Sequence, residues 1–183
     1  RIGNKVQAEV ALRRSGVVDV RQEDLSKQGR LPIETHIADF IQSKRDAGRG
    51  TRTVIDNQRI LKWLVVSTNA KVLDDLNANV IAGVLRNLHG AGRAARTVNH
   101  HLSLTSGFLK WCVRMGRLGS NPAQVLPFAD EAKDRRRERR SLSPVELHRL
   151  FEVAGPRGRL LWYMAALWAG LRRSDLMRLR WGD

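Results

Sequence analysis

Thiol and phenol side chains are almost absent from this sequence, which has one cysteine and one tyrosine in 183 residues. A single thiol excludes an intrachain disulfide and a zinc site built from several thiolates. Cys112 lies in an apolar stripe, which predicts a buried and unreactive side chain. Tyr163 lies in an apolar stretch and is expected to be a core aromatic. The cysteine usage fits a reducing compartment, so we expect a cytoplasmic protein.

Long apolar runs are also missing. No stretch of 18 apolar residues occurs and the N-terminal residues include no apolar signal core, so we predict neither a membrane span nor an export signal. The five histidines have no metal-ligand spacing beside suitable carboxylates, so we predict no metal site.

Acidic residues are few relative to basic ones, 18 against 33, and the formal net charge is +15. Most of the basic residues are arginines, whose guanidinium groups bind phosphates in a bidentate manner. A charge of this size predicts a polyanionic partner. An anionic membrane surface is the weaker alternative, because no long basic amphipathic helix with an aromatic face is present.

Residues 31–128 have the pattern of a helical domain. Apolar residues recur at spacings of three and four in four successive stretches, most clearly at Val98, Leu102, Thr105, Leu109 and Cys112. Short glycine-containing loops between the stretches predict a small four-helix bundle. Residues 1–30 are polar and weakly patterned, and we expect a connecting arm there, with a disordered tail as the alternative.

Residues 129–142 have the composition of a linker. Within them, the run KDRRRERR from Lys133 to Arg140 places six positive side chains beside two acids. Such a run cannot bury itself, which predicts a solvated hinge. We further expect Arg135, Arg136 and Arg137 to lie along a phosphate backbone.

A second folded unit is expected over residues 143–183. Ser143, Pro144 and Glu146 have the spacing of a helix N-terminus with a capping box. An apolar stretch from Leu160 to Trp168 then predicts a helix buried on most sides. We find no alternating strand pattern, so the fold class predicted for this chain is all-α.

The stretch from Trp168 to Asp183, WAGLRRSDLMRLRWGD, is the most specific pattern in the chain. An apolar helix ends at Gly170, and a second amphipathic element begins after Arg172. The stretch resembles the first catalytic arginine motif of the tyrosine recombinases, the phage-integrase family. In that family a small residue, Gly, Leu, Arg, a variable residue, Ser and an acid are followed by Leu-x-Trp-x-Asp.

The resemblance extends upstream of the motif. Residues 31–128 resemble the core-binding domain of that family, a SAM-like helical bundle, and residues 143–183 resemble the first helices of its mixed α/β catalytic domain. The resemblance implies a site-specific recombinase or integrase that binds duplex DNA in the nucleoid. The complete protein would cut and rejoin strands through a 3′-phosphotyrosine, without a metal or other cofactor. It would act with further protomers, whereas we expect this fragment to be monomeric in solution.

The resemblance assigns a catalytic role to Arg172, which follows Gly-Leu in the motif. A fixed guanidinium lowers the barrier to phosphoryl transfer because it already points at the charge that develops on the phosphorus oxygens. Asp175 is expected to support this site by bracing a basic group or the turn backbone, and a simple N-terminal helix acid is the alternative. The family's later lysine, its histidine–arginine pair and its nucleophilic tyrosine have no matching positions, so we expect this chain to bind DNA without recombining it.

Polar and basic residues that can contact DNA gather at the start of the fourth predicted helix and along the second. A helix N-terminus with nearby arginines suits a phosphate, and asparagine or arginine side chains there can reach base edges. The DNA-binding residues predicted in the bundle are Arg52, Arg59, Arg93, Arg96, Thr97, Asn99 and His100.

Two other classes of protein fit parts of the pattern. A non-enzymatic helical DNA-binding regulator would use Arg172 as a phosphate contact only. An RNA-associated basic protein fits the charge but not the two-unit layout. The chain also has few of the aromatic side chains on which single-stranded bases stack.

Overall fold

The computed structural model describes residues 25, 27–136 and 140–180. The chain divides into two compact units, one ending at Arg136 and one beginning at Arg137, and each is described by itself. Regular structure in the described ranges is helical, with a single β-bridge between Pro32 and Val72. The all-α prediction is confirmed for these residues. Most of the expected arm, residues 1–30, lies outside them.

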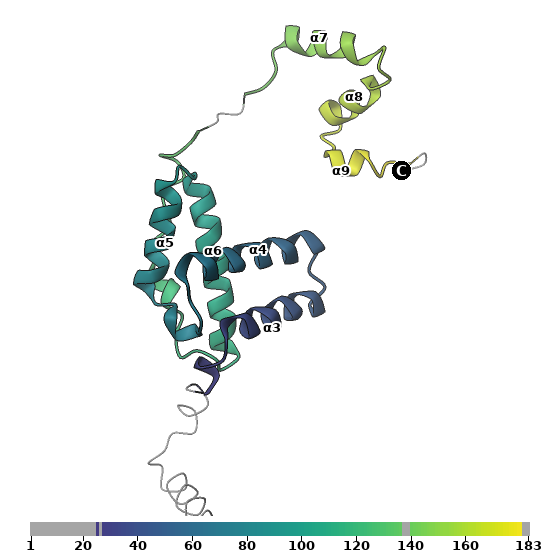
Figure 1. The fold of residues 1–183 in the computed structure, drawn as a ribbon. Coiled ribbons are helices and arrows are strands. Elements are labelled where there is room, and N and C mark those ends of the chain that lie inside the picture. Colours follow the sequence, from purple (N-terminus) through teal and green to yellow (C-terminus); the bar gives the residue numbers. More distant parts are fainter. Residues whose placement is uncertain (1–24, 26, 137–139, 181–183) are drawn as a thin grey trace, which may run out of the picture. The chain divides into compact units, whose positions relative to one another are not determined.

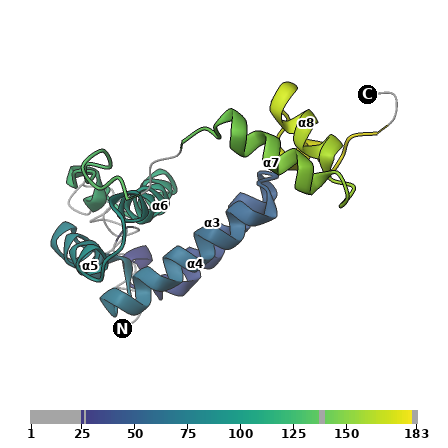
Figure 2. The ribbon, with the colours of Figure 1, turned by 90° about the horizontal axis from the view of Figure 1, so that it is seen from above.

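The first unit is built on two helix pairs. Figure 1 shows α3 and α4 side by side, and α5 and α6 as a second pair that runs crosswise to the first; Figure 2 shows the same arrangement from above. The elements are α3 (Ile33–Asp46), α4 (Thr51–Thr68), η1 (Leu73–Asp75), α5 (Ala78–Gly90), α6 (Ala95–Arg114) and η2 (Pro122–Val125). This agrees with the four-helix bundle predicted from the apolar spacing.

Helix α6 is central because α3, α4, α5 and η2 all pack against it. Its predicted apolar stripe is buried, from Val98 through Cys112. The ring of Phe40 on α3 meets Phe108 and Trp111 of α6 edge-on, with centroids 5.4 and 5.5 Å apart. The Cys112 thiol is fully buried, and burial raises its pKa to about 12, so the predicted inert core thiol is confirmed.

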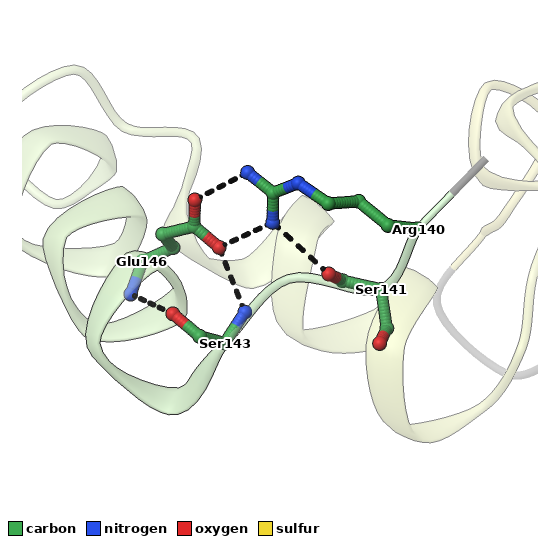
Figure 3. A network of polar contacts seen from close by, with 4 residues as sticks. All are labelled: Arg140, Ser141, Ser143 and Glu146. Atoms are coloured by element: carbon green, nitrogen blue, oxygen red, sulfur yellow. Dashed lines mark hydrogen bonds and ion pairs between the residues drawn. The ribbon is translucent and has the colours of Figure 1, made fainter. Parts of the chain in front are cut away.

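The second unit consists of α7 (Pro144–Ala154), α8 (Leu160–Trp168) and α9 (Arg173–Leu176). The predicted capping box is confirmed, since the Glu146 backbone N–H donates to the Ser143 hydroxyl and the Ser143 N–H donates to the Glu146 carboxylate (Figure 3). Arg140 adds a bidentate ion pair to Glu146 at 2.6 and 2.7 Å, and lowers the pKa of that carboxyl to about 2. The start of α7 is therefore fastened from two sides.

Helix α8 is less covered than its composition predicts. None of its nine residues is buried, and the Tyr163 side chain is 38% exposed, which corrects the prediction of a core aromatic for this part of the chain. Within the described second unit only α7 and α9 pack against α8, and these two short helices cannot cover all its faces. In the described part of the chain, no helix is long and apolar enough to cross a membrane.

Candidate nucleic-acid interface

A basic groove lies between α4, the end of α5 and the start of α6. Its volume is about 530 Å³. Five of the seven bundle residues predicted to contact DNA meet in its lining: Arg59, Arg93, Arg96, Thr97 and His100. The remaining lining residues are Ile60, Trp63, Leu88 and His101. The groove therefore combines cationic side chains with an apolar floor.

Helical periodicity explains why α6 supplies one wall of the groove. Arg96, Thr97 and His100 are spaced by one and three residues, which places them on one side of the helix. Val98 and Leu102 point to the opposite side and are buried in the core. The chain enters α6 through Gly92, whose φ of +80° only glycine adopts without strain, and Arg93 follows directly at the rim.

A carboxylate joins the two walls of the groove. Asp56 on α4 pairs with Arg59 and with His100 of α6, both at 2.6 Å. The hydrogen bond from His100 is the main reason that the pKa of Asp56 is lowered, and Arg59 adds to it. Asp56 thus orients two of the basic side chains and neutralises part of their charge.

Arg93 and Arg96 keep their full charge for a ligand. Both are exposed, and within the described part of the chain neither side chain makes a hydrogen bond or an ion pair. Because no ion pair has to be broken first, these two guanidinium groups can bind phosphate oxygens with little loss of free energy. Of the groove's basic side chains, they are therefore the best candidates for binding an anion.

Arg52 lies outside the groove but extends its α4 wall. It precedes Arg59 by seven residues, which is two helical turns and therefore the same face of α4. Asp56 and Trp63 lie on that face as well. The spacing 52, 56, 59, 63 is the signal in the sequence that places Trp63 at the groove, a residue that the sequence analysis missed.

The structure corrects the role predicted for Asn99. Its side chain is only 8% exposed, and its amide donates to the backbone oxygen of Ala129 and to the carboxylate of Glu131, both at 2.9 Å. The Asn99 amide oxygen accepts from the Ala129 N–H at 2.8 Å. These bonds use both polar atoms of the Asn99 amide, so neither is left to contact DNA. Asn99 instead holds residues 129 and 131 against α6.

The basic linker is also partly ordered. Residues 129–136 belong to the first unit and bond to it. The part of the predicted hinge from Lys133 to Arg136 is therefore mostly solvent-exposed, as predicted, but held to the bundle. Arg136 is half exposed, and its guanidinium binds Asp134 and the backbone oxygen of Gly92. Arg135 is exposed, and Arg137 lies outside the described residues.

The arginine motif of residues 168–183 includes a turn between α8 and α9. Gly170 has a φ of +62°, a conformation that favours glycine, and it ends α8. The Asp175 carboxylate accepts from the Arg172 backbone N–H at 3.2 Å. This bond fits both roles open to Asp175, because it braces the turn backbone and also makes Asp175 the acid of the first turn of α9. The Arg172 side chain is exposed, and no ion pair holds it among the described residues.

A buried histidine tethers the start of α3 to the loop after α6. The His36 Nε2 lies 3.1 Å from the backbone oxygen of Gln28, and its Nδ1 lies 3.2 Å from an Arg117 nitrogen. The carbonyl can only accept and the guanidinium can only donate, so His36 is neutral with its proton on Nε2. Burial is the main cause that lowers the pKa of His36, and Arg117 contributes to it.

We expect acid to weaken the bundle through His36. The unfolded chain takes up the proton at a pKa near 6.5, above the folded value, so stability is full above that pH and declines as the pH falls toward the folded pKa. The free energy of unfolding should fall by at most about 1.4 kcal/mol per pH unit for this group. Urea unfolding between pH 7.5 and 5 measures the slope, and His36→Gln should flatten it. Stability that rises on acidification would contradict the assignment.

Comparison with solved structures identifies the fold. Over 100% of its length the chain matches a lambda integrase dimer bound to a COC′ core site, with a TM-score of 0.72 and 18% identity, covering 51% of that chain. It matches a lambda integrase tetramer bound to a Holliday junction equally well, at 19% identity and 53% of that chain. The fold is therefore integrase-like, and the chain spans about half the length of these proteins.

Two further comparisons found no relative. No protein-family profile matches the chain. No curated protein matches its sequence. In the described residues no cluster of histidine, cysteine or acidic side chains could hold a metal ion.

Proposed function

We propose that this chain is the duplex-DNA-binding part of a tyrosine recombinase. The observation that carries the proposal is the groove between α4 and α6, where Arg59, Arg93, Arg96 and His100 converge from separate elements. Its apolar floor suits a deoxyribose and its cationic rim suits the phosphates on either side. The integrase-like fold supports the same assignment.

The complete protein would add the chemistry. We propose that Arg172 stabilises the charge that develops on the scissile phosphate, with its position set by the turn at Gly170 and by the Asp175 bond to its backbone. Cleavage and rejoining through a phosphotyrosine, and assembly with further protomers on DNA, belong to that proposal. The lambda integrase structures of similar fold are a dimer and a tetramer on DNA.

Salt dependence tests the groove directly. Each phosphate that a protein neutralises contributes about −0.9 to the slope of log K against log salt concentration for B-DNA. The groove offers two unpaired guanidinium groups, together with Arg59 and His100, which share Asp56, so we expect a slope of about −2 to −4. Fluorescence anisotropy of a labelled duplex, titrated at several KCl concentrations, measures it. A slope near zero would exclude binding through the phosphate backbone.

A non-enzymatic DNA-binding regulator would give the same salt slope. The coding frame downstream of Asp183 separates the two functions. A histidine-x-x-arginine motif and a later tyrosine would establish the enzyme, whereas a stop codon would leave a binding module in which Arg172 is a phosphate contact.

A further inference from the structure

Residues 129–136, which we call the exit segment, carry the chain out of the first unit. Two sets of contacts hold this segment against the start of α6. The first is the buried Asn99 amide, which exchanges hydrogen bonds with both backbone polar groups of Ala129 and also binds Glu131. These bonds hold the first half of the segment to the second turn of the helix.

Asp134 and Arg136 hold the second half. Helix α6 begins after Ala94, whose side chain cannot cap it, and Asp134 accepts from the Ala95 N–H at 2.6 Å instead. Arg136 binds both oxygens of that carboxylate, at 2.8 and 3.2 Å, and donates to the Gly92 backbone oxygen at 2.6 Å. The hydrogen bond from Arg136 is the largest cause that lowers the pKa of Asp134, and the bond from the Ala95 N–H adds to it.

The exit segment and the basic groove use different faces of the same helix end. Ala95 and Asn99, one turn apart, face the exit segment. Arg96, Thr97 and His100 line the groove. The first two turns of α6 therefore carry both the proposed DNA contacts and the point at which the chain leaves the unit.

The chain is fastened again where the second unit begins. Arg140 binds the Glu146 carboxylate at the start of α7 and the Ser141 backbone oxygen, as Figure 3 shows. Between the two fastened ends, Arg136 and Arg140, the chain can extend at most about 14 Å. Without the contacts of the exit segment, the span from Phe128 to Arg140 would extend up to roughly 43 Å.

We propose that the exit segment sets the tether between the two units, with Asn99 and Asp134 as its positioning residues. The inference rests on the proposed DNA-binding function, because a short tether is useful when both units bind one duplex. The effective concentration of a tethered partner falls at roughly the −3/2 power of tether length, so a tether three times as long lowers it about fivefold.

Spin-label distance measurements on the full 183-residue chain test the tether without DNA. Labels at Ser103→Cys on α6 and Val153→Cys on α7 report the spread of distances between the units, and the buried Cys112 stays unlabelled. We expect the distribution to broaden clearly in N99A/D134A. The matched control is D130A, which removes an acid of the same segment that contacts only Lys133 and local backbone. Equal widths in all variants would overturn the proposal.

Because Asn99 is buried, D134A alone provides a second test that leaves the core untouched. It should broaden the distribution to an intermediate width, and the same width as in the unmutated chain would count against the tether. Circular dichroism melting verifies that each variant is folded.

DNA affinity distinguishes the tether from the groove. N99A/D134A should bind a labelled duplex about fivefold more weakly than D130A, with the salt slope unchanged because the groove residues are intact. A reduced salt slope would mean that the variant damages the groove and would overturn the positioning role. If no variant binds DNA, the proposed function fails, while the distance measurement still decides whether the exit segment sets the tether.

Discussion

Alanine at Arg172 is expected to abolish strand cleavage in the complete protein while leaving DNA binding within about twofold of the unmutated value. The loss should be at least roughly 10²- to 10³-fold, the range seen when one preorganised donor to a developing oxyanion is removed. The reason is that the turn at Gly170 fixes the position of Arg172. Among the described residues no acid competes for the Arg172 guanidinium. Cleavage of a nicked duplex, which traps the covalent product, measures the effect.

Arg173 is the matched control for this experiment. It is adjacent, exposed and of equal charge, but it begins α9 instead of preceding it. R173A should cleave within a fewfold of the unmutated enzyme. If R172A cleaves normally, or if R173A is the defective variant, the assignment of the catalytic arginine is wrong.

Removing Arg93 and Arg96 together should weaken duplex binding by roughly a hundredfold, because charge-assisted hydrogen bonds contribute about 1.5 kcal/mol or more each. The salt slope should become shallower by about 2, since one phosphate contact is lost with each guanidinium. Both side chains are exposed at the groove, so the variant R93A/R96A should keep its melting temperature. Anisotropy titrations at several salt concentrations provide both quantities.

The control for the groove variant is R49A/R114A. Both arginines are exposed in the first unit, and neither lines the groove, so the change in net charge is the same. We expect a loss of affinity no greater than about threefold, from the weaker overall field. Equal losses in the two double variants would show that binding follows net charge and not the groove.

Local features of the sequence predicted much of this structure. The apolar spacing of Val98, Leu102 and Leu109 predicted α6, and the pair Ser143 and Glu146 predicted the start of α7, because both signals act within a few residues. Arginine content predicted an anionic partner. The prediction failed for Asn99, which has the chemistry of a DNA contact but lies against residues 30 positions later in the chain.

What the sequence determined by itself is therefore the set of helices, the inert thiol, the sign of the charge and the arginine motif, all of which depend on neighbouring residues or on composition. Only the tertiary structure decided which basic residues share a groove, that Asp56 links its two walls, and that Asp134 completes the start of α6. These depend on pairs separated by about forty residues, such as Asp56 with His100 and Ala95 with Asp134. Contacts of that kind leave no periodic signal, because they form only when packing of the apolar faces brings the helices together.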